Sequence, residues 1–166
     1  SHSEVGFSVR HMMVSKVKGS FESFSGTITI GADPLDSSVT ADVDLNSITT
    51  RDAGRDEHLR SADFFDVTNH PALTFRSTGV KAKGSDFVVL GDLSIKGVTH
   101  PVELDLEFNG TNGDPWGGTR AGFSAQTEIN RKDFGIEFNI PIDGGGVVVG
   151  DKIKVTLEVE AVLQAD

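Results

Sequence analysis

Apolar and polar residues alternate along most of this chain, a pattern typical of β-strands that bury one face and expose the other. The first alternating segment places Val5, Phe7, Val9 and His11 on one side of a strand. Regular alternation favours antiparallel pairing, because an antiparallel sheet can keep one face dry and the other wet. We predict eight strands, whose apolar positions lie within residues 5–11, 17–30, 39–45, 73–77, 87–93, 102–108, 121–129 and 153–161.

The second segment changes phase partway along. Val17 and Phe21 share one face, but after Ser23 the apolar positions restart at Phe24. A β-bulge shifts the phase of a strand in this way, because it inserts one extra residue opposite the partner strand. The sequence therefore predicts one continuous strand with a bulge at Ser23.

An eight-stranded sheet with one apolar face must cover that face. Since the chain offers only one helical segment, closure of the sheet on itself is the economical arrangement. A barrel of about this size is either filled by its own side chains or holds one small ligand. We predict a single all-β domain over residues 1–166, an eight-stranded antiparallel barrel, with a two-layer β-sandwich as the alternative.

Residues 51–71 interrupt the alternation with a charged insert. The insert carries eight charged residues and two His around Leu59, Phe64 and Phe65. Asp52 follows Thr49 by three residues, and an acid at this point favours the positive end of a helix. We therefore predict a helix near residues 51–66, at the mouth of the barrel, where it acts as a lid or as a site in its own right.

The net charge limits the classes of partner that the chain can bind. The chain has 25 acids against 15 bases, a net charge of −10, whereas nucleic acids and anionic lipid surfaces both require clustered Lys and Arg. There is no Cys, so a disulfide framework and a cysteine nucleophile are excluded. No apolar run approaches the ~18 residues of a transmembrane helix. No leader is visible, which favours the cytoplasm, but a start at Ser1 leaves a periplasmic or secreted location open.

Signatures of catalysis and of metal or cofactor binding are sparse. The chain lacks a Gly-x-Ser-x-Gly elbow, a His-Glu-x-x-His pair and a phosphate-binding Gly-rich loop. Asp42, Asp44 and Asn46 have the spacing of the first three ligands of a calcium-binding loop, but Ser47 occupies the sixth position, where that loop needs Gly. The five His have no ligand spacing. We therefore predict neither catalytic residues nor a metal site, and expect no cofactor.

A few polar residues still admit two interpretations. His11 continues an apolar face, which indicates either a hydrogen-bonded core His or a side chain that faces a ligand. Arg55, Asp56 and Arg131 indicate either salt bridges that hold the insert to the rim or an Arg that meets an anionic head group.

The aromatic content points to apolar burial. The chain has 11 Phe, one Trp and no Tyr, so that almost all of its rings lack a polar atom. Many of these Phe occupy the apolar positions of the predicted strands. Filling of a core and lining of a cavity for a long apolar molecule explain this pattern equally well.

Several blocks of sequence, in a fixed order along almost the whole chain, resemble the YceI-like family. The blocks are Ser1-His2-Ser3-x-Val5-x-Phe7-Ser8-Val9-Arg10-His11-Met12, Gly19-x-Phe21-x-x-Phe24-x-Gly26, Arg55-Asp56-x-His58-Leu59-Arg60-Ser61-x-Asp63-Phe64-Phe65-Asp66, Pro71-x-x-x-Phe75-x-Ser77-Thr78, residues 91–102 and residues 130–136. The resemblance implies a lipocalin-like barrel that binds a polyisoprenoid or similar long-chain amphiphile, often as a homodimer. It supplies no catalytic residue.

The resemblance favours a ligand cavity over a filled core. Holding a long prenyl chain requires burial of apolar surface and no chemistry. The expected function is therefore carriage or storage of a polyisoprenoid or similar lipid. The alternatives are an enzyme acting on such a substrate, with His11 as its candidate residue, and a filled barrel that serves as a stress-related interaction module. The expected lining residues are Phe7, Val9, His11, Phe21, Phe24, Ile28, Val43, Leu45, Phe75, Val89, Leu104, Leu106, Phe123, Ile129, Phe134 and Leu157.

Overall fold

The computed structural model describes residues 3–140 and 148–164, so that Ser1 and His2 of the first family block lie outside the described residues. The described residues form ten strands, one α-helix and three short 3-10 helices. In chain order these are β1 (Glu4–His11), β2 (Ser15–Phe21), β3 (Phe24–Thr29), η1 (Pro34–Asp36), β4 (Ser38–Asp44), η2 (Leu45–Ser47), β5 (Ile48–Thr49), α1 (Ala53–Arg60), β6 (Ala72–Lys83), β7 (Asp86–Ile95), β8 (Val98–Gly113), β9 (Thr119–Asn130), η3 (Arg131–Phe134) and β10 (Val149–Val162).

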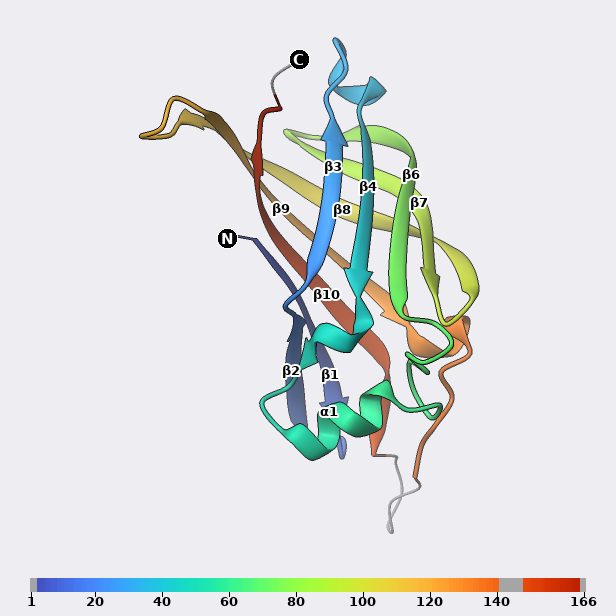
Figure 1. Ribbon diagram of the computed structural model, residues 1–166. Coiled ribbons are helices and arrows are strands. Elements are labelled where there is room, and N and C mark those ends of the chain that lie inside the picture. Colours follow the sequence, from blue (N-terminus) through green and yellow to red (C-terminus); the bar gives the residue numbers. More distant parts are fainter. Residues whose placement is uncertain (1–2, 141–147, 165–166) are drawn as a thin grey trace.

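The strands join in one antiparallel sheet of order β3-β4-β6-β7-β8-β9-β10-β1-β2-β5. Figure 1 shows that this sheet curls strongly, with α1 at one end. The two ends of the order are connected through the chain, because β3 follows β2 directly and β5 follows β4 after η2. Two main-chain hydrogen bonds join them at this point: Glu22 N donates to Ser47 O at 3.2 Å, and Asp44 N donates to Ser23 O at 2.9 Å.

The prediction of an all-β antiparallel fold with one helical insert is confirmed, but the prediction of eight strands is wrong, because the described residues form ten. The expected second strand is divided into β2 and β3, and β5 is an additional short strand. The phase change at Ser23 marks this division.

The break between β2 and β3 is caused by the segment that pairs with them, residues 43–48. Phe21 pairs with Ile48, whereas Phe24 pairs with Val43. Two residues of one strand therefore face the four residues 44–47 of the other, which is more than one bulge accommodates. The excess folds into η2, which the Asp44 carboxylate caps by accepting the N–H of Asn46 at 2.9 Å.

The alternation of the sequence sets the register of the strands. On β1 and β10, Val9 lies opposite Ile153, Phe7 opposite Val155 and Val5 opposite Leu157. Residues directly opposite each other point to the same face, so the apolar rows of the two strands coincide on the inner face of the curled sheet. The intervening residues of β10, such as Thr156, are exposed on the outer face.

Two groups of buried apolar side chains form the core, and the insert contributes to both. Leu59 and Phe65 of the insert, together with Leu73, pack against both groups. The first group is Phe64, Phe75, Val89, Leu93, Ile95, Phe134 and Ile136. The second group is Val5, Phe21, Val43, Leu45, Ile48 and Val67.

Gly91 in β7 permits the ring of Phe75 to lie directly on the strand. A methyl group at Gly91 would collide with that ring and approach the carbonyl oxygen of Arg76 to 2.8 Å. We therefore expect Gly91→Ala to lower the free energy of unfolding by about 1–3 kcal/mol, the usual cost of overpacking. Gly54→Ala in α1 is the matched control, because its nearest neighbour is Asp52 Oδ1 at 3.5 Å. Urea unfolding should show no loss for it, since Ala is the better helix former.

The β8–β9 hairpin projects from the sheet and ends in a turn held by Asp114 (Figure 1). Asp114 Oδ1 accepts the N–H of Trp116 at 2.9 Å and of Gly118 at 2.8 Å, and Oδ2 accepts Nε of Arg120 at 3.1 Å. The hydrogen bond from Gly118 lowers the pKa of the Asp114 carboxyl below its ordinary 3.8; partial desolvation opposes this, and Arg120 adds to the lowering.

The lowered pKa of Asp114 predicts an acid transition confined to the turn. A carboxyl with a depressed pKa in the folded state stabilises that state above its unfolded pKa, and the contribution is lost as pH falls through the folded pKa. Trp116 is the only Trp of the chain and is 82% exposed, so its fluorescence reports on the turn. We expect this fluorescence to stay constant down to about pH 4 and to change below it. Asp114→Asn should abolish the transition; an unchanged transition would assign it to another group.

Candidate functional site

The inner face of the curled sheet is partly filled and partly open. Of the sixteen lining residues predicted from the sequence, seven are buried: Phe21, Val43, Leu45, Phe75, Val89, Phe123 and Phe134. The other nine are half-buried: Phe7, Val9, His11, Phe24, Ile28, Leu104, Leu106, Ile129 and Leu157. All of the buried residues except Phe123 belong to the two core groups. The half-buried residues carry the apolar surface that a ligand can cover.

The half-buried residues form continuous rows along the strands. In β8, Val102, Leu104 and Leu106 are half-buried while the residues between them are exposed. In β10 the same alternation runs from residue 151 to residue 159. A strand that covers a filled core buries its inner row, as Val89, Leu93 and Ile95 of β7 do. The inner rows of β8 and β10 thus retain apolar surface in contact with solvent.

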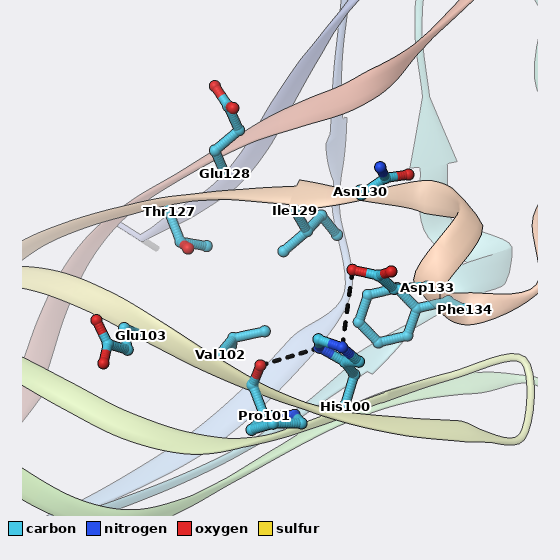
Figure 2. Close-up of a pocket in the computed structure, with 10 residues that line it drawn as sticks. All are labelled: His100, Pro101, Val102, Glu103, Thr127, Glu128, Ile129, Asn130, Asp133 and Phe134. Atoms are coloured by element: carbon cyan, nitrogen blue, oxygen red, sulfur yellow. Dashed lines mark hydrogen bonds and ion pairs between the residues drawn. The ribbon is translucent and has the colours of Figure 1, made fainter.

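β8 and β9 separate along part of their length, and a slit opens between them. The two strands pair from Asp105 and Gln126 to the hairpin turn. On the other side of this point, residues 98–104 pair with β7 and residues 127–130 pair with β10. A hollow of about 330 Å³ occupies the gap (Figure 2).

Three apolar side chains face the gap between the two strands. Figure 2 shows the side chains of Val102 and Ile129 pointing toward each other across the gap, with Phe134 at its end. Phe134 belongs to the first core group, and Val102 and Ile129 pack against that group. Val102 lies in the same row as Leu104, so the slit borders the apolar inner face.

The rim of the slit is polar and mainly acidic. Glu103, Glu128 and Asp133 lie around the hollow. At the end formed by η3, His100 Nε2 lies 3.7 Å from Asp133 Oδ2, and the rings of His100 and Phe134 are 5.8 Å apart. His100 Nδ1 lies 3.0 Å from the carbonyl oxygen of Pro101 and donates a hydrogen bond to it when protonated there. Three carboxylates thus lie around the opening of the slit.

A second hollow, of about 400 Å³, lies between the β6–β7 turn and strands β8 to β10. Charged and polar side chains, among them Lys83, Asp105 and Glu158, make up most of its lining. Lys83 Nζ and Asp105 Oδ1 form an ion pair at 3.1 Å across it. Of the predicted lining residues it contains Leu106.

The charged residues of the insert fasten it to the sheet. Asp56 is buried and accepts the N–H of Thr50 at 2.8 Å and the hydroxyl of Thr50 at 2.5 Å. Arg55 donates from Nε to Thr50 Oγ1 at 2.8 Å, and Arg60 donates to the carbonyl oxygens of Asn46 and Ile48 at 3.1 and 3.2 Å. The hypothesis that these charges hold the insert down is supported, but their partners outside the helix are Thr50 and main-chain carbonyls; among the described residues, the one ion pair that they form, between Arg60 and Glu57 at 3.6 Å, lies within α1.

Arg131 is the most completely buried charged residue among those described, with 1% of its surface exposed. Nε donates to Gly150 O at 3.0 Å, and one terminal nitrogen donates to Ile136 O at 2.8 Å and Phe138 O at 2.9 Å. The other terminal nitrogen lies 3.3 Å from Asp151 Oδ1. Because its donors are used by these groups, Arg131 has none left for a head group.

His11 lies at the end of β1, half-buried and outside both core groups. Among the described residues its imidazole makes no hydrogen bond and no ion pair, and no group of three or more His, Asp or Glu is placed to hold a metal ion. A general base needs a group that orients it, and the described part of the chain provides none for His11.

Sequence reasoning missed Val102, His100 and Asp133 as site residues. Val102 continues the row of Leu104 and Leu106, so its position was available from the alternation. The other two come together only because η3 folds against the start of β8.

Comparisons with known proteins agree with this architecture. The profile of the YceI-like domain matches residues 1–161. The chain is 42% identical to Protein YceI of Shigella flexneri over 84% of its own length and 73% of that protein. The crystal structure of BcnA from Burkholderia cenocepacia matches with a TM-score of 0.83 at 22% identity, over 96% of each chain. A polyisoprenoid-binding domain from Saccharophagus degradans, implicated in plant cell wall breakdown, matches with a TM-score of 0.69 at 16% identity, over 95% of this chain and 92% of that one.

The helical content of the described residues is small, and no helix among them has the length and apolar character needed to cross a membrane.

Proposed function

The chain belongs to the YceI-like family, and on that premise we propose that it binds a polyisoprenoid or similar long-chain amphiphilic lipid and carries or stores it. The lipid chain lies along the inner face of the curled sheet, which acts as a barrel around it. Related folds include a polyisoprenoid-binding domain, which supports this ligand class. The observation that carries the proposal is the half-buried state of the inner apolar rows of β8 and β10.

The energetics favour an extended apolar ligand. Covering apolar surface is worth about 25 cal/mol per Å², or about 0.8 kcal/mol for each buried CH₂ group. Part of this gain offsets the loss of motion of both partners, so a chain of several isoprene units is needed for tight binding. The rows of Leu104 and Leu106 on β8 and of Val155 and Leu157 on β10 offer such a surface.

The slit between β8 and β9 provides the entrance in this proposal. Val102 and Ile129 guide the apolar chain inward, while Glu103, Glu128 and Asp133 stay at the surface beside the head group. Since like charges repel at short range, this rim favours a neutral head group over a phosphate. The proposal therefore departs from the alternative interpretation, in which an Arg at the mouth meets an anionic head group.

Titration of lipid-free protein tests the proposed function. The protein is unfolded and delipidated, refolded, and titrated with a long-chain polyprenol, with the corresponding polyprenyl phosphate and with a short prenol of two isoprene units. We expect the long polyprenol to bind one molecule per chain, more tightly than the phosphate and far more tightly than the short prenol. Equal affinity for the long and short prenols would contradict burial of an extended chain.

Catalysis is not needed for this function. The enzyme alternative rests on His11, whose imidazole has no hydrogen-bonding partner among the described residues. The proposed homodimer and cytoplasmic location remain predictions from the sequence.

A further inference from the structure

The turn between β1 and β2 exposes three apolar residues in succession. Met12 is 48%, Met13 50% and Val14 87% exposed. Met12 and Met13 have φ values of 52° and 65°, in the left-handed region that is unfavourable for a residue other than Gly. Ile140, 52% exposed, lies beside the turn, because Val148 donates to the Ile140 carbonyl and accepts from Met12 N. We call Met12, Met13, Val14 and Ile140 the apolar tip.

Basic residues gather on the outer face of the three strands that lead to this tip. Arg10 lies directly opposite Lys16, and Ser8 has Lys18 on one side and Lys154 on the other. Lys152 lies two residues before Lys154, on the same face. We call this surface the basic strip; it holds five of the chain's 15 Lys and Arg, namely Arg10, Lys16, Lys18, Lys152 and Lys154.

The basic strip has one acidic neighbour on β9, Glu128, which lies directly opposite Lys154. Among the described residues, Arg10, Lys16, Lys18 and Lys154 form no ion pair, and Lys152 lies 3.7 Å from Glu128 Oε1. Like charges directly opposite each other on a sheet are destabilising, as for Arg10 and Lys16. Unpaired like charges beside an apolar tip in strained backbone conformation lower stability, and neither feature belongs to the core groups of the described residues.

We propose that the apolar tip and the basic strip together dock the protein on an anionic phospholipid membrane. The apolar side chains enter the boundary between head groups and acyl chains, and the cations face the phosphate groups above it. A surface that binds membranes through apolar insertion and electrostatic attraction has this composition. The net charge of −10 argues against such docking only if the charges are evenly spread, and the register of β2, β1 and β10 shows that they are not.

Sedimentation with vesicles tests the docking surface. The vesicles contain equal parts of phosphatidylglycerol and phosphatidylcholine, or phosphatidylcholine alone, and no isoprenoid. We expect the protein to bind the anionic vesicles at 50 mM salt, to bind the neutral vesicles much more weakly, and to dissociate at 500 mM salt. Since no isoprenoid is present, a failure here leaves the proposed lipid carriage untouched.

Two pairs of variants assign the binding to the surface. Each cation near an anionic membrane is worth about fivefold in affinity, so Lys16→Gln with Lys18→Gln should weaken binding by roughly 25-fold. Lys81→Gln with Lys83→Gln, two exposed lysines with the same spacing on β6, should change it less than twofold. Val14→Asp should weaken binding by more than about tenfold, whereas Ile30→Asp, at a 65% exposed residue after β3, should not.

The proposal is overturned if the protein does not bind anionic vesicles, or binds neutral vesicles equally well. It is also overturned if the paired substitutions at Lys16 and Lys18 weaken binding no more than those at Lys81 and Lys83. Unchanged thermal unfolding of the variants excludes misfolding as the cause of a loss.

Discussion

Replacing Arg131 by methionine will lower the free energy of unfolding by about 3–5 kcal/mol, the usual cost of removing one partner from a buried charged network. The substitution removes the donor from the buried carbonyl oxygen of Ile136 and from the partly buried carbonyl oxygens of Phe138 and Gly150. Each unsatisfied buried group costs about 1–3 kcal/mol. The melting temperature should therefore fall by roughly 10 °C, as measured by calorimetry.

The neighbouring Lys132 is the matched control for this prediction. Lys132 is exposed and its Nζ lies 3.5 Å from Asp151 Oδ2, so Lys132→Met should change the free energy of unfolding by less than about 1 kcal/mol. Arg131→Lys keeps the positive charge but loses the planar set of guanidinium donors. Its loss in free energy of unfolding should therefore lie between those of Arg131→Met and Lys132→Met. A loss for Arg131→Met no larger than that for Lys132→Met would show that the network does not hold the 136–138 segment.

Placing a carboxylate on the inner face will abolish lipid binding while the fold persists. Val155 is half-buried on the inner face of β10, outside both core groups. Val155→Asp puts an unpaired charge against the bound chain, and burying such a charge costs several kcal/mol. We expect the affinity for a long polyprenol to fall by more than about a hundredfold, since each 1.4 kcal/mol is a factor of ten.

The adjacent residue provides a control with the same new side chain. Thr156 is exposed on the outer face, so Thr156→Asp should leave the affinity for the polyprenol within about twofold. Circular dichroism and thermal unfolding establish that both variants fold. Equal losses for the two variants, or none for either, would contradict binding on the inner face.

The sequence predicts the sheet well because the signal for a half-buried strand is local. Alternation identifies the inner rows of β1, β8 and β10, which hold six of the nine half-buried residues among the predicted lining. The phase change between Phe21 and Phe24 marks the break between β2 and β3 at the right place. The sequence does not reveal that residues 44–47 lie opposite residues 22–23 at this break. That arrangement depends on pairing between segments that are distant in the chain.

The slit and the basic strip are not visible from local pattern. β8 alternates in the same way on both sides of Asp105, although it leaves β9 at that point. Lys16, Lys18 and Lys154 appear in the sequence as ordinary outer residues, and only the adjacency of β2, β1 and β10 gathers them. The sequence marks Arg131 as a charge that needs partners, but not that two of these partners are main-chain carbonyls in the irregular segment after η3.

Native mass spectrometry of the protein as purified tests the central claim most directly. The claim predicts a folded species heavier than the chain by the mass of one long-chain lipid. On collisional activation or organic extraction this species should return to the mass of the chain, and the extract should contain a molecule built from repeated isoprene units. Val155→Asp should lack the heavier species, whereas Thr156→Asp should retain it. A protein that carries no added mass, and takes up none when incubated with long polyprenols, would contradict the account.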